Sequence, residues 1–127
     1  MGALEDFDVA RAEFARLVAL VPIPLLEDPT PCSEWTLRQL LNHVVTGTQW
    51  FTTVVLGEPA PDRVADQILS DPSVAFARRA DEFRAAMAEP DGSDGGLLLE
   101  GIVLRLQADL RWLEACEQSW TVRRGVR

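Results

Sequence analysis

Apolar residues recur every three or four positions in three well separated parts of the chain. This spacing predicts helices that each bury one face. The first helix is expected from Leu4 to Val21 and the second from Leu37 to Val55. The third is expected to begin after Asp71 and to end before Pro90.

The predicted helices have identifiable start and stop signals. Thr36 and Gln39 stand three residues apart, as in a capping box, and Gly57 follows the second stripe as a natural stop. Asp71 can cap the third helix, and Pro72 then occupies the first helical position, where its missing N–H costs nothing. These signals fix the boundaries of the second and third helices better than the apolar spacing does.

Prolines crowd the two connections, residues 22–31 and 58–70, so both are expected to be irregular. In the second connection, residues 64–69 are a candidate for a short turn of helix. The polar, glycine-rich stretch 91–96 is expected to be a flexible turn. Residues 121–127 lie beyond the last apolar stripe and are expected to form a flexible tail.

The stretch from Leu97 to Trp120 admits two interpretations. Its apolar residues keep helical spacing, which predicts one long helix. Alternatively, Gly101 divides Leu97 to Leu104 into a small hairpin ahead of a shorter helix. We favour the helix. Four amphipathic helices must pack together to bury their stripes, so the predicted fold is an all-α four-helix bundle that forms a single domain over residues 1–127.

Composition and charge exclude several function classes. The chain is 47% hydrophobic and 25% charged, which is ordinary for a globular protein. Its formal charge of −8 repels nucleic-acid phosphates and anionic lipid, so neither nucleic acid nor a membrane is expected as a partner. Met1 to Asp8 is acidic where a secretory signal would be basic, and a cytoplasmic location is expected. Cys32 and Cys116 form neither a zinc pattern nor a disulfide framework and are expected to be thiols.

One stretch carries a specific resemblance. Residues 29–45 read PTPCSEWTLRQLLNHVV, and Trp50-Phe51, Gly57-Glu58-Pro59 and Asp71-Pro72 continue the pattern. This sequence resembles the start of the second helix in the DinB-like, mycothiol-dependent maleylpyruvate isomerase family of actinobacteria. The resemblance covers roughly residues 4–90 and supports the four-helix bundle.

The resemblance implies a divalent metal, usually zinc or nickel, held between the helices. In that family the metal is bound by a histidine of the second helix, here His43, and by an acid and a histidine four residues apart on the last helix. Enzymatic members use the metal to activate mycothiol or a related low-molecular-weight thiol. The resemblance therefore implies a metal cofactor and a thiol cosubstrate.

This chain departs from the family pattern on the last helix. It contains a single histidine, and counting four residues on from Asp109 leads to Leu113. The C-terminal third is short and only weakly similar, as expected from divergence, a truncated gene product or an altered reading frame. The metal site is therefore expected to be incomplete.

The candidate metal ligands are His43, Asp109 and Cys116, since the last two lie on one side of the last helix, two turns apart. Gly47 and Trp50 follow His43 at successive turns and are the candidate substrate-binding residues. The alternatives are ordinary: a boundary histidine bonded to a carbonyl or carboxylate, a solvated acid and a cysteine that packs as a small hydrophobe. Cys32 is interpreted as structural.

Two functions follow. The first is a metal-dependent enzyme that acts with a small thiol. The second is a non-catalytic bundle that binds a ligand or forms a homodimer and has lost the metal site. The missing histidine favours the second function.

Overall fold

Each of the four predicted apolar stripes forms a helix in the computed structural model, which describes residues 2–31, 34–88 and 95–123. The helices are α1 (Ala3–Val18), α2 (Leu37–Leu56), α3 (Pro72–Met87) and α4 (Gly95–Arg123), with a 3-10 turn η1 (Ile23–Leu25) between the first two. The all-α four-helix bundle is confirmed. The long helix is also confirmed in place of the hairpin alternative.

The start and stop signals work as predicted. The Thr36 hydroxyl accepts a bond from the Gln39 N–H at 3.2 Å, and the Gln39 side chain accepts one from the Thr36 N–H at 2.8 Å. Gly57 ends α2 with φ of 69°, a left-handed conformation that glycine adopts without strain. The Asp71 carboxylate accepts a bond from the Val74 N–H at 3.2 Å and so caps α3.

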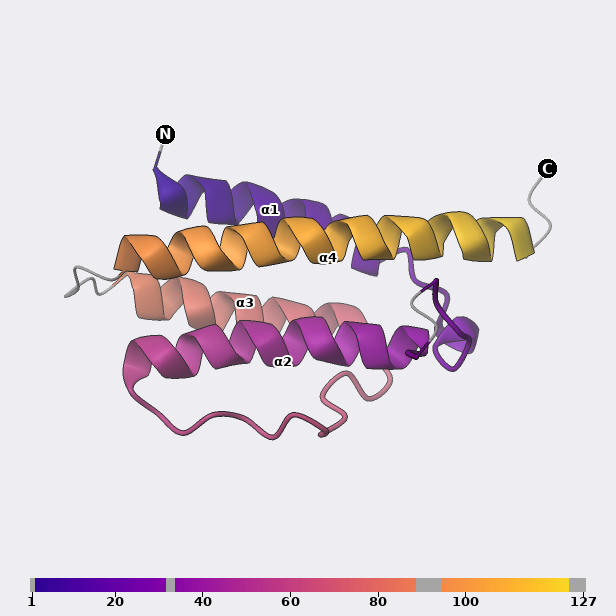
Figure 1. Cartoon of the computed structure of the whole chain (residues 1–127), viewed down its shortest axis with the longest axis horizontal. Coiled ribbons are helices and arrows are strands. Elements are labelled where there is room, and N and C mark those ends of the chain that lie inside the picture. The colour runs from indigo at the N-terminus through magenta and orange to yellow at the C-terminus, as the bar shows by residue number, and fades with distance from the viewer. Residues whose placement is uncertain (1, 32–33, 89–94, 124–127) are drawn as a thin grey trace.

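The helices pack in a ring in which α1 touches α4 and α3, and α2 touches α3 and α4. Figure 1 shows that α1 and α4 run in one direction and that α2 and α3 run in the other. Because α2 and α3 run the same way, the chain must return along the bundle between them. Residues 57–71 make this return, and we call them the crossover segment (Figure 1).

All four helices contribute buried side chains to the core, and α1 meets α3 there through two pairs of phenylalanine rings. The Phe7 and Phe83 rings pack at a tilt with centroids 5.0 Å apart, and the Phe14 and Phe76 rings do so at 4.9 Å. All four side chains are buried, and burying one such ring is worth roughly 1.5 to 3 kcal/mol. These ring pairs hold α1 against α3.

Four boundary predictions need comment. The first helix ends at Val18 rather than Val21, because Pro22 disfavours helical geometry in the residue before it. The helical turn predicted at 64–69 is wrong, since those residues form irregular chain with isolated turns and a bend. The chain is still helical at 121–123, where we expected a flexible tail. The rest of that tail and most of the predicted 91–96 turn lie outside the described residues.

None of the described helices combines the length and the apolar character that crossing a bilayer requires.

Candidate functional site: a charged cleft beside His43

The crossover segment is fastened to α2 by Asn42. Its side-chain oxygen accepts bonds from the N–H groups of Gln67 and Ile68, at 2.8 and 3.1 Å, and its amide donates to Asp66 at 3.0 Å. Arg38, one turn earlier on α2, donates to Asp66 at 2.9 Å. Ile68 is buried in the core. The segment is therefore held as a wall beside α2.

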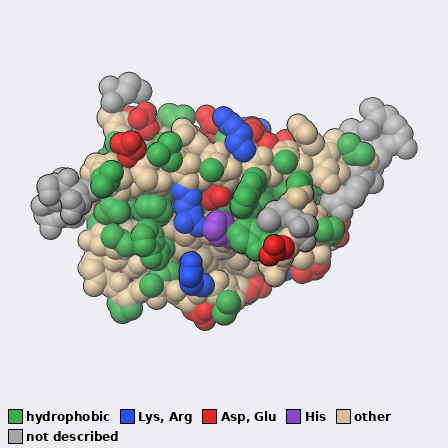
Figure 2. Space-filling view, in the orientation of Figure 1, with side chains coloured by type: hydrophobic (Ala, Val, Ile, Leu, Met, Phe, Trp, Pro, Cys, Tyr) green, Lys and Arg blue, Asp and Glu red, His purple; other side chains and the backbone are tan. Residues whose placement is uncertain are grey.

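A cleft of about 950 Å³ lies between this wall, α2 and α4. Figure 2 shows the histidine on this face, with arginine and acidic side chains next to it. The residues that line the cleft are Trp35, Arg38, Gln39, Asn42, His43, Thr46, Gly47, Trp50, Ala60, Pro61, Arg63, Val64, Ala65, Asp66 and Arg105. The cleft thus collects arginines on a protein whose net charge is negative.

The central contact of the cleft joins His43 to Arg105 of α4. The guanidinium Nη2 lies 3.0 Å from the imidazole Nε2. Burial, the largest cause, and the positive charges of Arg105 and Arg63 together lower the pKa of His43 to about 4. The imidazole is therefore neutral at physiological pH and accepts the hydrogen bond that the guanidinium donates.

Asp109 lies one turn further along α4 and completes a charged triad with His43 and Arg105. Its carboxylate is 4.0 Å from the His43 Nε2 and 3.7 Å from the Arg105 Nε. Burial raises the pKa of Asp109 to about 6, while the Arg105 charge acts in the opposite direction. Neither the Arg105 Nε nor the Asp109 Oδ2 has a hydrogen-bond partner in the described part of the chain. Arg105 is thus held to the neutral His43 by a hydrogen bond and to Asp109 by opposite charge.

Two tryptophan rings pack near the imidazole of His43. The Trp35 ring lies 4.7 Å from the His43 ring and packs edge-on against Trp112 at 5.7 Å. Trp50 lies two turns along α2, lines the cleft and is 44% exposed. Its indole is available to contact a ligand, as the sequence predicted for this residue, although no ligand tests that role.

Gly47 lines the cleft, but Arg105 uses the space that it leaves. A Cβ at this position would lie 2.5 Å from the Arg105 Nη2 and 2.6 Å from the Cζ. The absence of a side chain at Gly47 therefore lets the guanidinium reach His43. We expected the glycine to make room for a small molecule, and the structure gives that room to an arginine.

The structure brings two of the three candidate ligands together. The His43 Nε2 lies 4.0 Å from the Asp109 carboxylate, beside the cleft that His43 lines, whereas Cys116 is buried among the core residues. No three His, Cys, Asp or Glu residues in the described ranges gather closely enough to hold a metal ion. Cys32 lies outside the described residues.

The residue of α4 that reaches His43 lies four positions before Asp109, whereas the sequence comparison with the family pointed to the position four residues after it. Leu113, four residues after Asp109, is fully buried in the core. Arg105, four residues before Asp109, is the residue that reaches His43. Sequence analysis missed Arg105 because it searched for metal donors and an arginine is none. The i, i+4 spacing from Asp109 was the signal that would have found it.

These residues do not fit a divalent metal. Zinc requires three or four protein donors, with nitrogen about 2.0 to 2.1 Å from the ion. His43 and Asp109 supply one imidazole and one carboxylate, and the imidazole nitrogen already faces a guanidinium 3.0 Å away. A double and a single positive charge about 3 Å apart repel by on the order of 10 kcal/mol at an effective dielectric constant of about 20.

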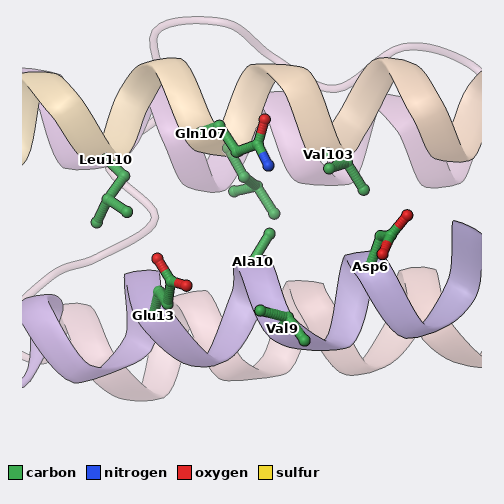
Figure 3. Close-up of a pocket in the computed structure, with 8 residues that line it drawn as sticks. Asp6, Val9, Ala10, Glu13, Val103, Gln107 and Leu110 are labelled. Carbon is green, nitrogen blue, oxygen red and sulfur yellow. The ribbon is translucent and has the colours of Figure 1, made fainter. Parts of the chain in front are cut away.

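A second, smaller hollow of about 300 Å³ lies between α1 and α4. Figure 3 shows Asp6 and Glu13 of α1 near its two ends and Gln107 of α4 between them. The two carboxylates stand about two helical turns apart and do not converge on one point. This groove has none of the close charge pairing that distinguishes the cleft.

Comparison with known proteins agrees with this architecture. The family model described as the mycothiol maleylpyruvate isomerase N-terminal domain matches residues 7–127, and the chain belongs to this family. The match continues to the last residue, so the similarity extends further than the residues 4–90 that we expected.

Two curated relatives come from Mycobacterium tuberculosis. They are the uncharacterized proteins Rv0738 of strain H37Rv and MT0763 of strain CDC 1551, each 40% identical over 57 residues. The matched stretch is 42% of this chain and 31% of each relative, so the chain spans less than a third of their length. No solved structure matches the chain significantly.

Proposed function

We propose that this chain is a binding domain for a low-molecular-weight thiol, mycothiol or a similar compound, and that the thiol occupies the cleft beside His43. Two findings support this proposal. The chain belongs to a mycothiol-related family, and its cleft of about 950 Å³ is large enough for a small molecule. The observation that carries the proposal is the guanidinium fixed at the centre of the cleft by His43 and Asp109.

The guanidinium gives the cleft a preference for a thiol. A cation beside a thiol lowers its pKa from about 8.5 and favours the thiolate. The proton released goes to solvent, because the pKa of His43 is about 4 and the imidazole does not hold a proton at neutral pH. Trp35 and Trp50 supply apolar surface for the rest of the ligand.

A binding role without a metal is favoured over the metal-dependent enzyme. The enzyme implied by the resemblance uses a zinc or nickel ion, and the described residues offer two donors beside a competing cation. Binding a thiolate requires only the positive charge and the cleft. We therefore favour the non-catalytic module among the two functions.

Calorimetric titration with mycothiol and with its analogue carrying a hydroxyl in place of the thiol tests the proposal. We expect the wild-type protein to bind the thiol at least tenfold more tightly than the analogue. Arg105→Gln should abolish this difference. Arg111→Gln is the matched control, because this arginine lies on α4, is 72% exposed and, among the described residues, pairs with Glu114. Equal affinity for both compounds, or no binding of either, would contradict the proposal.

A further inference from the structure

We infer that the Arg105 guanidinium is a built-in cation that takes the place of a metal ion between His43 and Asp109 and makes this cleft independent of metals. The inference goes beyond thiol binding, because it concerns which cation the protein uses. It also identifies Arg105 as the residue that excludes a metal.

The guanidinium of Arg105 lies where a metal bound by His43 and Asp109 would have to lie. A metal bound by this pair would need the lone pair of an imidazole nitrogen and a carboxylate oxygen. The Arg105 Nη2 faces that imidazole nitrogen at 3.0 Å, and its Nε lies 3.7 Å from the Asp109 carboxylate. Both groups that would bind a metal are already directed at one positive charge.

Gly47 and Asp109 keep the Arg105 guanidinium beside His43. Gly47 has no side chain, and any Cβ would overlap the guanidinium at 2.5 to 2.8 Å. The Asp109 side chain is only 7% exposed, so its negative charge has little water to compensate it. Removing Arg105 would leave this carboxylate buried without a positive partner.

The Arg105 guanidinium has hydrogen-bond donors left to bind a ligand. All the hydrogen bonds of Arg105 within the described residues go to His43, so the Nη1 group keeps its donors for a ligand. Arg63 lines the same cleft from the crossover segment and has no ion pair with a described carboxylate. The cleft therefore presents positive charge to an anionic sulfur or oxygen atom of the ligand.

A change at position 105 separates this inference from an ordinary ion pair. Arg105→Glu removes the cation and adds a carboxylate one helical turn before Asp109, which gives His43 and Asp109 a third donor. The test titrates untagged protein with zinc chloride and with nickel chloride. Calorimetry measures binding, and the melting temperature measures stabilisation. We expect no metal-dependent change for the wild-type protein, and none when a chelator is added.

Arg105→Glu should bind zinc at least 100-fold more tightly than the wild-type protein, and its melting temperature should rise with zinc. Adding His43→Ala to this variant should remove the gain. Arg105→Gln is the matched control, which lacks the cation but adds no donor and should bind zinc much more weakly than Arg105→Glu. Arg105→His supplies an imidazole donor and repeats the test if Arg105→Glu does not fold.

Two results would overturn the inference. One is a wild-type protein that takes up an equivalent of zinc or nickel and loses it in His43→Ala. The other is a folded Arg105→Glu or Arg105→His protein whose zinc affinity equals that of the wild type. Neither result depends on whether mycothiol binds, so failure of this inference and failure of the proposed function are distinguishable.

Discussion

The α1–α3 interface and the cleft between α2 and α4 are built in opposite ways. The first contains two pairs of buried phenylalanine rings that pack at a tilt, Phe7 with Phe83 and Phe14 with Phe76. The second contains a charged triad with two polar atoms that lack hydrogen-bond partners in the described residues. This small bundle therefore separates the part that provides stability from the part that provides chemistry.

The largest expected effect comes from the core. Phe83→Ala should lower the free energy of unfolding by about 3 to 5 kcal/mol, because it leaves a cavity beside Phe7 and Phe51. Urea denaturation followed by circular dichroism measures this loss. While the protein remains folded, ligand affinity should be unchanged. A loss below about 1 kcal/mol, or a loss of binding by the folded variant, would show that the two parts are not separate.

The pH dependence of stability sharpens the comparison from the side of the cleft. The pKa of His43 falls from 6.5 to about 4 on folding, so its contribution to stability is lost as the pH decreases through this range. The pKa of Asp109 rises from 3.8 to about 6, so its contribution is lost as the pH increases through that range. The two trends oppose each other, and their sum should be nearly flat between about pH 4 and 6.

Single substitutions should uncover each trend. Asp109→Asn should become less stable as the pH falls from 6.5 towards 4, whereas His43→Gln should become less stable as the pH rises from about 4 to 6. The slope should stay below ~1.4 kcal/mol per pH unit, because His43 is partly exposed and water screens its charge. Denaturation midpoints measured across this pH range give the slope for each variant. Two variants with the same slope as the wild type would contradict the assignment.

The helix caps provide a smaller and more uniform effect. Thr36→Ala and Asp71→Ala should each cost about 1 kcal/mol, because each removes the acceptor for one N–H group at a helix start. Thr36 begins the helix that carries His43, and Asp71 begins the helix that carries Phe76. Equal losses in urea denaturation would show that the caps are local. A much larger loss for one of the two variants would show that its cap also supports the packing of that helix against its neighbours.

The smallest expected effect is a change in the pKa of His43. Arg105→Gln should raise this pKa from about 4, because one of the positive charges that lower it is gone. The rise should stop well short of 6.5, since burial is the larger cause and remains. Titration of the imidazole by NMR measures the change, with Arg111→Gln as the control that leaves it unaltered. A pKa that does not move would place the guanidinium away from the ring.

Much of the fold was predictable because it rests on local rules. Helical periodicity and the caps at Thr36 and Asp71 depend on residues that are close in sequence, and these predictions were confirmed. The turn predicted at 64–69 failed because that segment is shaped by bonds to Asn42, some 25 residues away. A connection fixed by distant partners carries no periodic signal of its own.

The site was predictable only in part. His43 and Asp109 were identified correctly as neighbours, because each lies at the edge of an apolar stripe. Cys116 was placed on the right helix, but its side chain joins the core. Arg105 was missed because the expected site contained a cation from outside the chain, so no residue was sought to supply one. Tertiary packing determines which side of α4 faces α2. It brings Arg105 to His43 and buries Leu113 in the core.

The crossover segment also has a consequence for how this domain can diversify. One side of the cleft is a connection whose only buried hydrophobic anchor is Ile68, while the bundle's other large buried side chains lie elsewhere. Residues between Gly57 and Asp66 can therefore be exchanged without repacking four helices. A library of substitutions at Ala60, Pro61 and Arg63 offers a way to retune ligand choice on an unchanged scaffold.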